Sequence, residues 1–355
     1  MADNKVLIVS HSSRETDLEY CSRENLNKRY NRNGRLDSLP DFSTLKPASY
    51  YEVYSGALSF YKILYQPEFN LKFIGSIKSR KIIQHAAFLK EDIIAVAYEN
   101  AVEIWKLNSS IYKCNKINRN SLETIRRHES GLMAGIHSVC AFDDTKLILS
   151  ASASDSVIIL DYYSGKFIDY FRMPGSIYGN NYVLNQDSDL LKHYIPNDYQ
   201  LTHINSAYPF NNNSNIVIST LIQGAIGIFD ITDSSYREIT RGYTGCHGAR
   251  VNSNSDIYFV DSCAGELIIL DNTGNIKSLF SLDTYWLHDA IELDEDIYIF
   301  TLADKNSLRI YNIKTRKMLM QKDFISSTGY FSGILELLPS WIGNSVKFLS
   351  LYTLN

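Results

Sequence analysis

The fold is decided by residues 247–271, which read His247-Gly-Ala-Arg-Val251, then Ile257-Tyr-Phe-Val260, then Glu266-Leu-Ile-Ile-Leu-Asp271. These three short runs are separated by turn-forming residues, mainly Asn, Ser, Asp and Gly. Short runs rich in β-branched and aromatic residues between such turns are typical of β-strands. A fourth run, Ile276-Lys-Ser-Leu-Phe280, follows directly. The stretch therefore predicts four consecutive short strands.

The same pattern occurs five times, and each copy begins with a histidine: His85, His137, His203, His247 and His288. From each histidine to the last apolar residue of the third strand, the interval is 20, 23, 26, 23 and 23 residues. Four strands within roughly 41–44 residues make one blade of a β-propeller. The repeats therefore predict five blades of an all-β propeller.

The two ends of the chain supply a further blade. From the inside of this blade outward, its expected strands are residues 332–337, 345–351, 55–61 and 71–75. Joining both ends in one sheet closes the ring and removes open sheet edges. Lys5–Ser10 is a surplus strand in this scheme: it is either the true second strand of this blade or a sign of a seventh. We expect a single domain over residues 1–355 with six blades, and seven as the alternative.

Composition and charge exclude several classes of protein. The 355 residues carry 35 basic and 39 acidic side chains, a net charge of -4, so a broad nucleic-acid surface is not expected. No apolar run approaches the roughly 18–20 residues that span a bilayer. The five cysteines are scattered singly, which argues against disulfides and against a cysteine zinc site. We expect a cytoplasmic chain with no nucleic-acid or membrane partner.

Five of the eight histidines begin the first strand of a blade. The first strand of each blade lines the central channel, so these residues are expected at one channel mouth. Long loops near 11–54, 118–136 and 174–202 are expected at the same end, and function on β scaffolds concentrates in such loops. The pattern predicts a His-lined pocket there. The alternative is a structural histidine of the kind found in WD repeats, bonded inside each blade.

Converging imidazoles favour a divalent transition metal such as Fe, Cu, Zn or Ni. Three or four ligands leave a position open for substrate, as catalysis requires. The leading hypothesis is a mononuclear Fe(II) enzyme of oxygenase or lyase type, with a small, aromatic or peptide substrate at the mouth. Its metal ligands are drawn from His85, His137, His203, His247 and His288. Carotenoid-cleavage oxygenases, propellers that hold iron through histidines of several blades, offer a fold-level analogy.

Two segments resemble a local motif pair of arylsulfotransferase-type six-bladed propellers. Leu201-Thr-His-Ile-Asn-Ser206 is similar to their His-x-Asn-Ser motif, and Cys246-His-Gly-Ala-Arg250 to their Gln-His-Asp-x-Arg motif. The resemblance covers two blades of six. Cys246 and Gly248 stand where that family has Gln and Asp.

The resemblance implies metal-free group transfer through a histidine nucleophile. The catalytic residues it implies are His203, Asn205, His247 and, as a partner for the transferred anion, Arg250. A third hypothesis is a non-catalytic, WD-like protein-interaction scaffold. The three hypotheses differ in whether the mouth holds a metal, a transferred group or neither.

Overall fold

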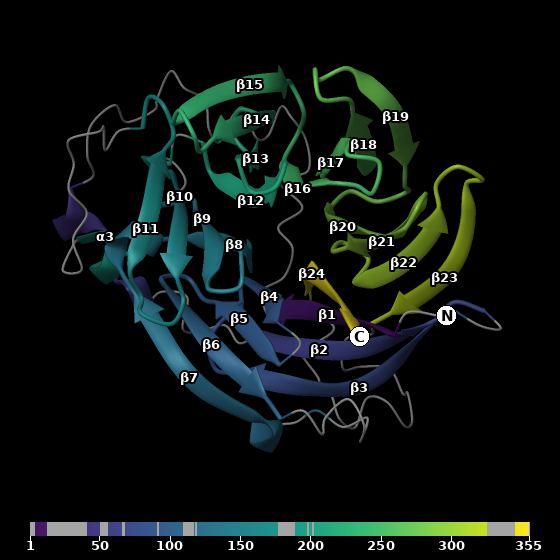
Figure 1. The fold of residues 1–355 in the computed structure, drawn as a ribbon, viewed down its shortest axis with the longest axis horizontal. Coiled ribbons are helices and arrows are strands. Elements are labelled where there is room, and N and C mark those ends of the chain that lie inside the picture. The colour runs from purple at the N-terminus through teal and green to yellow at the C-terminus, as the bar shows by residue number, and fades with distance from the viewer. Residues whose placement is uncertain are drawn as a thin grey trace.

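Four-stranded antiparallel sheets repeat six times around a central axis in the computed structural model (Figure 1). The structure describes residues 4–12, 41–49, 56–65, 68–90, 92–108, 117, 119–176, 189–196, 199–200, 202–324 and 345–354. The inner strands contact one another in the order β24, β4, β8, β12, β16, β20 and back to β24. The ring is therefore closed, and the chain is a six-bladed propeller.

The blades are numbered here from the one that both termini share, and strands are given from inside to outside. Blade 1 consists of β24 (Ser345–Leu354), β1 (Asn4–Ser12), β2 (Gly56–Leu64) and β3 (Asn70–Ser79). Blade 2 consists of β4 (His85–Lys90), β5 (Ile93–Ala97), β6 (Ala101–Leu107) and β7 (Leu122–Glu129). Blade 3 consists of β8 (Ile136–Ala141), β9 (Lys146–Ala151), β10 (Ser156–Asp161) and β11 (Phe167–Arg172).

The other three blades follow without interruption by the termini. Blade 4 consists of β12 (Ile204–Phe210), β13 (Asn215–Thr220), β14 (Ala225–Asp230) and β15 (Ser235–Arg241). Blade 5 consists of β16 (Cys246–Val251), β17 (Ile257–Asp261), β18 (Glu266–Leu270) and β19 (Ile276–Ser281). Blade 6 consists of β20 (Leu287–Asp294), β21 (Ile297–Leu302), β22 (Ser307–Asn312) and β23 (Lys317–Asp323).

The hydrophobic core is divided among the six interfaces between neighbouring blades. The middle strands are buried on both faces, so β9 and β17 are almost continuously apolar. Trp105 of β6, 1% exposed, fills the interface between blades 1 and 2. Since each blade packs against two neighbours, an open ring would expose two apolar sheet faces to water.

The closing blade differs from its predicted strand order. β24 is the innermost strand and pairs with β1, which pairs in turn with β2 (Figure 1). The prediction of 345–351 as the second strand was wrong, because Lys5–Ser10 holds that position. Residues 332–337, the expected inner strand, lie outside the described residues. Both termini build blade 1, as expected, and the surplus strand is used without a seventh blade.

The three predicted mouth loops have two different outcomes. The stretch 118–136 is not a loop, because it contains the outer strand β7 between the 3-10 helices η5 (Arg119–Ser121) and η6 (Gly131–Met133). The stretches 11–54 and 174–202 meet where they are described: Pro47 bridges His193, and the Tyr194 amide donates to Lys46 O at 2.9 Å. That junction includes η3 (Phe42–Thr44) and the short helix α3 (Asp189–Lys192). No helix of the described residues has the length and apolar character to cross a membrane.

Candidate functional site at the channel mouth

The five repeat histidines lie at three different positions on their inner strands. In blades 2 to 6, the last residue of the second strand pairs with one inner-strand residue, which serves as a common reference. These reference residues are His85, Ile136, Ile204, Cys246 and Leu287. His137, His247 and His288 come one residue later, whereas His203 comes one residue earlier. The single register expected from the sequence is therefore corrected.

Asn205 shares the position of the three later histidines. It lies one residue after its reference residue Ile204, in a β-bulge between Ile204 and Ser206. His137 and His288 occupy bulges at the corresponding places in β8 and β20. Blades 3 to 6, which are consecutive in the ring, thus present His, Asn, His and His at one level of the channel wall. We call His137, Asn205, His247 and His288 the mouth ring.

The imidazoles come together as two pairs rather than as one group of five. The ring centres of His247 and His288 are 4.7 Å apart, and those of His137 and His203 are 4.5 Å apart. His203, His247 and His288 are each less than a tenth exposed. No three His, Cys, Asp or Glu side chains of the described residues form a group that could hold a metal. A metal ion at the mouth stays a prediction.

His247 has a defined tautomer. Its Nδ1 lies 2.8 Å from Gly245 O and 2.8 Å from Ser262 Oγ. A backbone carbonyl only accepts, so Nδ1 carries the proton and Nε2 carries the lone pair. A carbonyl bonded to one ring nitrogen is the usual way in which a metal-ligating histidine is oriented. His247 is therefore set to act as an electron-pair donor through Nε2.

Asn205 is fully buried, and its two amide atoms have different surroundings. Its Nδ2 donates to Cys246 O at 2.7 Å, which fixes the orientation of the amide. Its Oδ1 has no hydrogen-bond partner among the residues that the structure describes. A buried acceptor without a partner is rare in folded proteins. Oδ1 is therefore suited to a donor group or a cation that a ligand brings to the mouth.

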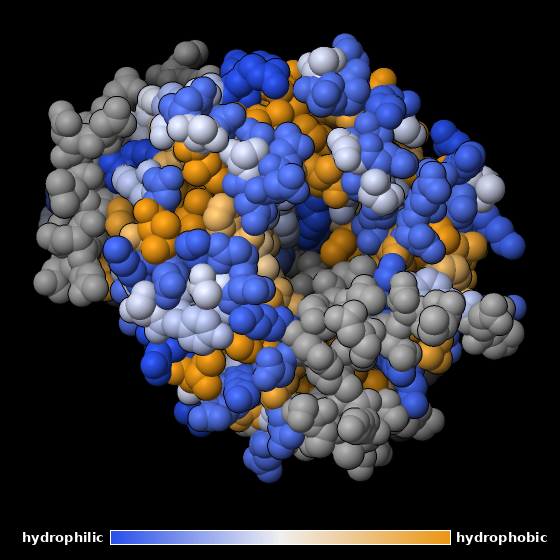
Figure 2. Space-filling model, viewed as in Figure 1, coloured by the Kyte–Doolittle hydropathy of each residue, from blue (hydrophilic) through white to orange (hydrophobic). Residues whose placement is uncertain are grey.

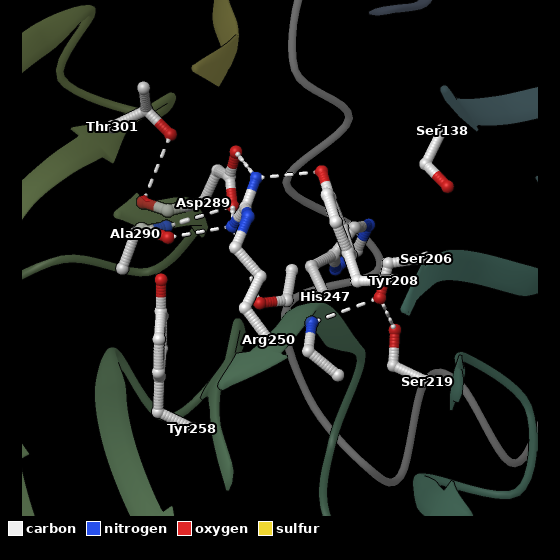
Figure 3. Close-up of polar contacts among 12 residues, drawn as sticks. Ser138, Ser206, Tyr208, Ser219, His247, Arg250, Tyr258, Asp289, Ala290 and Thr301 are labelled. Carbon is white, nitrogen blue, oxygen red and sulfur yellow. Dashed lines mark hydrogen bonds and ion pairs between the residues drawn. The ribbon is translucent and has the colours of Figure 1, made fainter. Parts of the chain in front are cut away.

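Arg250 lies deeper in the channel, in a buried ion pair with Asp289 (Figure 3). Its Nη1 donates to Asp289 Oδ1 at 2.5 Å and its Nη2 to Asp289 Oδ2 at 2.9 Å. Nη1 also donates to Ala290 O at 2.7 Å. Burial acts to lower the pKa of Arg250, but the adjacent charge of Asp289 and its hydrogen bonds raise that pKa above its usual value. The arylsulfotransferase resemblance implies that Arg250 binds the transferred anion, but in the structure Arg250 is paired with Asp289.

A hydrogen-bonded chain extends from this pair across the channel. Arg250 Nη2 donates to the Tyr208 hydroxyl at 2.9 Å, and that oxygen lies 3.2 Å from His85 Nε2. Because the hydroxyl accepts from Arg250, its proton is directed to His85 Nε2. Burial, the largest cause, lowers the pKa of His85 to about 3, so the ring stays neutral. His85 on β4 and Tyr208 on β12 are separated in the ring by β8, so the contact crosses the channel.

The sequence-predicted residues therefore divide into two groups. His137, His203, Asn205, His247 and His288 gather at the mouth level, whereas His85 and Arg250 belong to the crossing chain. Sequence reasoning missed Tyr208 and Ser262, because neither stands out in a tyrosine-rich and serine-rich chain. Figure 2 shows the face drawn there as hollowed at the centre of the ring, with hydrophilic residues in the hollow.

One pocket that the structure describes lies away from the channel, at the rim of blade 2. It is lined by Ala48, Lys81, Gln84, Glu99, Arg127 and Leu191, among others. Gln84 Nε2 donates to Glu99 Oε2 at 2.7 Å, so part of its polar lining is internally bonded. The pocket contains none of the histidines that the sequence singles out, and it is separate from the mouth ring.

Comparison with known proteins assigns the chain to no family. No protein-family model matches the sequence. No curated protein matches it. Solved structures do match, and among the most similar is the crystal structure of the C-terminal WD40 domain of Sif2. That structure is 17% identical, with a TM-score of 0.43, and the match covers 75% of this chain and 66% of that chain. The chain is a β-propeller by its own six sheets, and the arylsulfotransferase resemblance stays a prediction.

Proposed function

We propose that this propeller is an enzyme that binds a divalent transition metal and a small substrate at its channel mouth. The observation that carries the proposal is the His247–His288 pair, with His247 held by its Nδ1 proton. Two imidazoles on one ion, each at about 2.0–2.1 Å through nitrogen, have ring centres roughly 4.6–5.3 Å apart. The separation of 4.7 Å fits that range.

The other members of the mouth ring complete the argument. Asn205 Oδ1 adds a neutral oxygen donor, and oxygen ligands beside imidazole are compatible with Fe(II) and related ions. A bound ion would polarise an oxygen of the substrate or lower the pKa of a bound water. His137 and His203 form a second imidazole pair beside Asn205, so they are suited to contact the substrate.

His203 provides independent support because its backbone is strained. Its φ is 50°, and the corresponding residues of blades 3 and 5 are Gly135 and Gly245, with φ of 70° and 82°. Side-chain-bearing residues are uncommon in this region, and such strain clusters at functional sites. A histidine at a position suited to glycine is consistent with a role for its ring at the mouth.

Metal-free sulfuryl transfer is less well supported by the geometry. That chemistry needs a cation beside the transferred anion, and the guanidinium of Arg250 is paired in bidentate fashion with Asp289. His247 itself fits either role, since a lone pair on Nε2 serves a metal or an electrophile equally.

Melting curves with and without Fe(II), recorded anaerobically, test the proposal. Added Fe(II) should stabilise the wild type by about 2.7 kcal/mol when its free concentration is 100 times Kd. The His247→Ala variant should lose this shift. The matched control is His128→Ala on β7, whose ring contacts Tyr162 O at 2.8 Å outside the channel. It should lose some stability and keep the full shift.

One result would contradict the proposal, and a second assay would then show which hypothesis replaces it. A wild type that gains no stability from Fe(II), Zn(II) or Co(II) would contradict metal binding. If that protein also exchanged sulfuryl groups between phenols, the transferase hypothesis would replace it. If it did neither, the scaffold hypothesis would remain.

A further inference from the structure

We propose that the buried Arg250–Asp289 pair is a positioning device that sets the spacing of His247 and His288. The inference rests on the proposed function, because the spacing matters only if the two histidines bind a metal. The spacing itself can be measured without any metal. In this proposal neither Arg250 nor Asp289 contacts a ligand. Both act through the backbone segments that carry the two histidines.

The spacing of these histidines needs an explanation because no backbone ladder connects their strands. β16 and β20 belong to different sheets, so side chains must fix their relative placement. The ion pair bonds to the backbone of both strands: Arg250 Nη1 donates to Gly248 O at 3.3 Å on β16 and to Ala290 O at 2.7 Å on β20. Asp289 Oδ1 also accepts from the Ala290 amide at 2.9 Å. The pair therefore joins the residues directly next to His247 and His288.

Gly248 shows how closely the pair lies against the strand. Its φ is 59°, and a Cβ at this position would lie 2.3 Å from Asp289 Oδ1 and 2.9 Å from Arg250 Nη1. Only glycine leaves room for the pair at this place. The ion pair thus packs directly against Gly248, the residue after His247, so His247 and the pair belong to one packed unit.

A role in positioning also agrees with the energetics of buried charges. Taking two charges out of water offsets most of their attraction, so well-packed apolar residues often replace a buried pair without loss of stability. The pair is therefore a weak source of stability. Its bidentate geometry, in contrast, fixes both distance and orientation between two strands.

The test is the ring-to-ring nuclear Overhauser effect in metal-free protein with selectively labelled histidines. In the wild type we expect cross-peaks within both imidazole pairs, His247–His288 and His137–His203. The double variant R250M/D289L keeps an apolar filling and removes the pair. It should lose the His247–His288 cross-peak and keep the His137–His203 cross-peak, which serves as the internal control.

Two further variants keep the outcome interpretable. Gly248→Ala displaces the pair without removing its charges, and it should weaken the same cross-peak. It provides the test if the double variant fails to fold. Asp155→Asn is the matched control: Asp155 is as buried as Asp289 but accepts from Thr202, away from this interface. It should lower stability and leave the His247–His288 cross-peak intact.

Co(II) titration of the same proteins separates this inference from the proposed function. If the variants lose the His247–His288 cross-peak and the wild type binds no Co(II), the positioning role is upheld and the proposed metal site is contradicted. An unchanged cross-peak in folded R250M/D289L and G248A would overturn the positioning role, whatever the Co(II) result. If both ideas hold, the two variants should also bind Co(II) at least about tenfold more weakly.

Discussion

At the residue scale, His203 combines a buried ring with a backbone conformation that disfavours any side chain. The variants His203→Gly and His203→Ala both lose the ring contact with His137, so they differ mainly in backbone strain. Alanine at positive φ keeps the strain that glycine relieves. We expect the glycine variant to be more stable than the alanine variant by about 1 kcal/mol. Urea unfolding measures the difference, and an alanine variant of equal or greater stability would show that the backbone at 203 is not strained.

His85 makes stability depend on pH because burial lowers its pKa from 6.5 to about 3. In the unfolded chain the ring takes up a proton near pH 6.5, and the folded chain refuses it until about pH 3. The unfolded state therefore binds more protons in this window, and the free energy of unfolding falls as pH falls. The slope from this group approaches about 1.4 kcal/mol per pH unit.

The comparison for that prediction is His85→Gln, which retains an acceptor for Tyr208 and does not titrate. Unfolding free energies between pH 7 and pH 4 should fall less steeply for this variant than for the wild type. Parallel curves would mean that the folded ring takes up its proton as readily as the unfolded one.

The residue scale is also where the sequence was least informative. The spacing of the histidines within the repeat predicts correctly that they lie near the starts of inner strands. It does not reveal β-bulges, such as the one between Ile204 and Ser206, which shift a side chain by one position without any sequence signature. Contacts between distant inner strands, such as Tyr208 with His85, depend on the closed ring and leave no local pattern.

At the scale of elements, strand type was predicted better than strand position. Middle strands such as β9 are buried on both faces and therefore read as continuous apolar runs. The outer strand β7 was missed because an edge strand faces solvent, and its sequence LETIRRHE carries mostly charged and polar residues. β24 was expected second in its blade, and β1 was left surplus, because an apolar run does not show which of two neighbouring strands lies inside.

The pairing of β1 with β24 leads to a prediction about the chain ends. Asn4 pairs with Leu354, so a short turn can join the termini into a hairpin without disturbing blade 1. A circular permutant with new ends in the exposed turn at Asp271–Asn275 should stay soluble, elute at the volume of the parent protein and melt cooperatively. Deletion of residues 345–355 removes the inner strand of blade 1 and should cause aggregation. Size-exclusion chromatography distinguishes the outcomes, and a soluble, cooperative truncated chain would contradict closure by β24.

At the scale of the whole molecule, the closed ring explains why the mouth ring exists at all. Blades that are consecutive in the ring place equivalent positions side by side at one level of the channel wall. A different residue in one repeat, such as Asn205 where three other blades have histidine, then changes the site that all these blades share. The crossing chain from Asp289 through Arg250 and Tyr208 to His85 spans the same channel with bonded polar groups.

In the proposed metal site, His247 and His288 of the mouth ring are the ligands. Its most direct test is the metal content of protein purified anaerobically from metal-replete cells, measured by mass spectrometry for wild type, His247→Ala, His288→Ala and His128→Ala. We predict about one equivalent of a transition metal in the wild type and in His128→Ala, and little in the other two. Equal metal content in all four proteins, or none in a folded wild type, would contradict the claim.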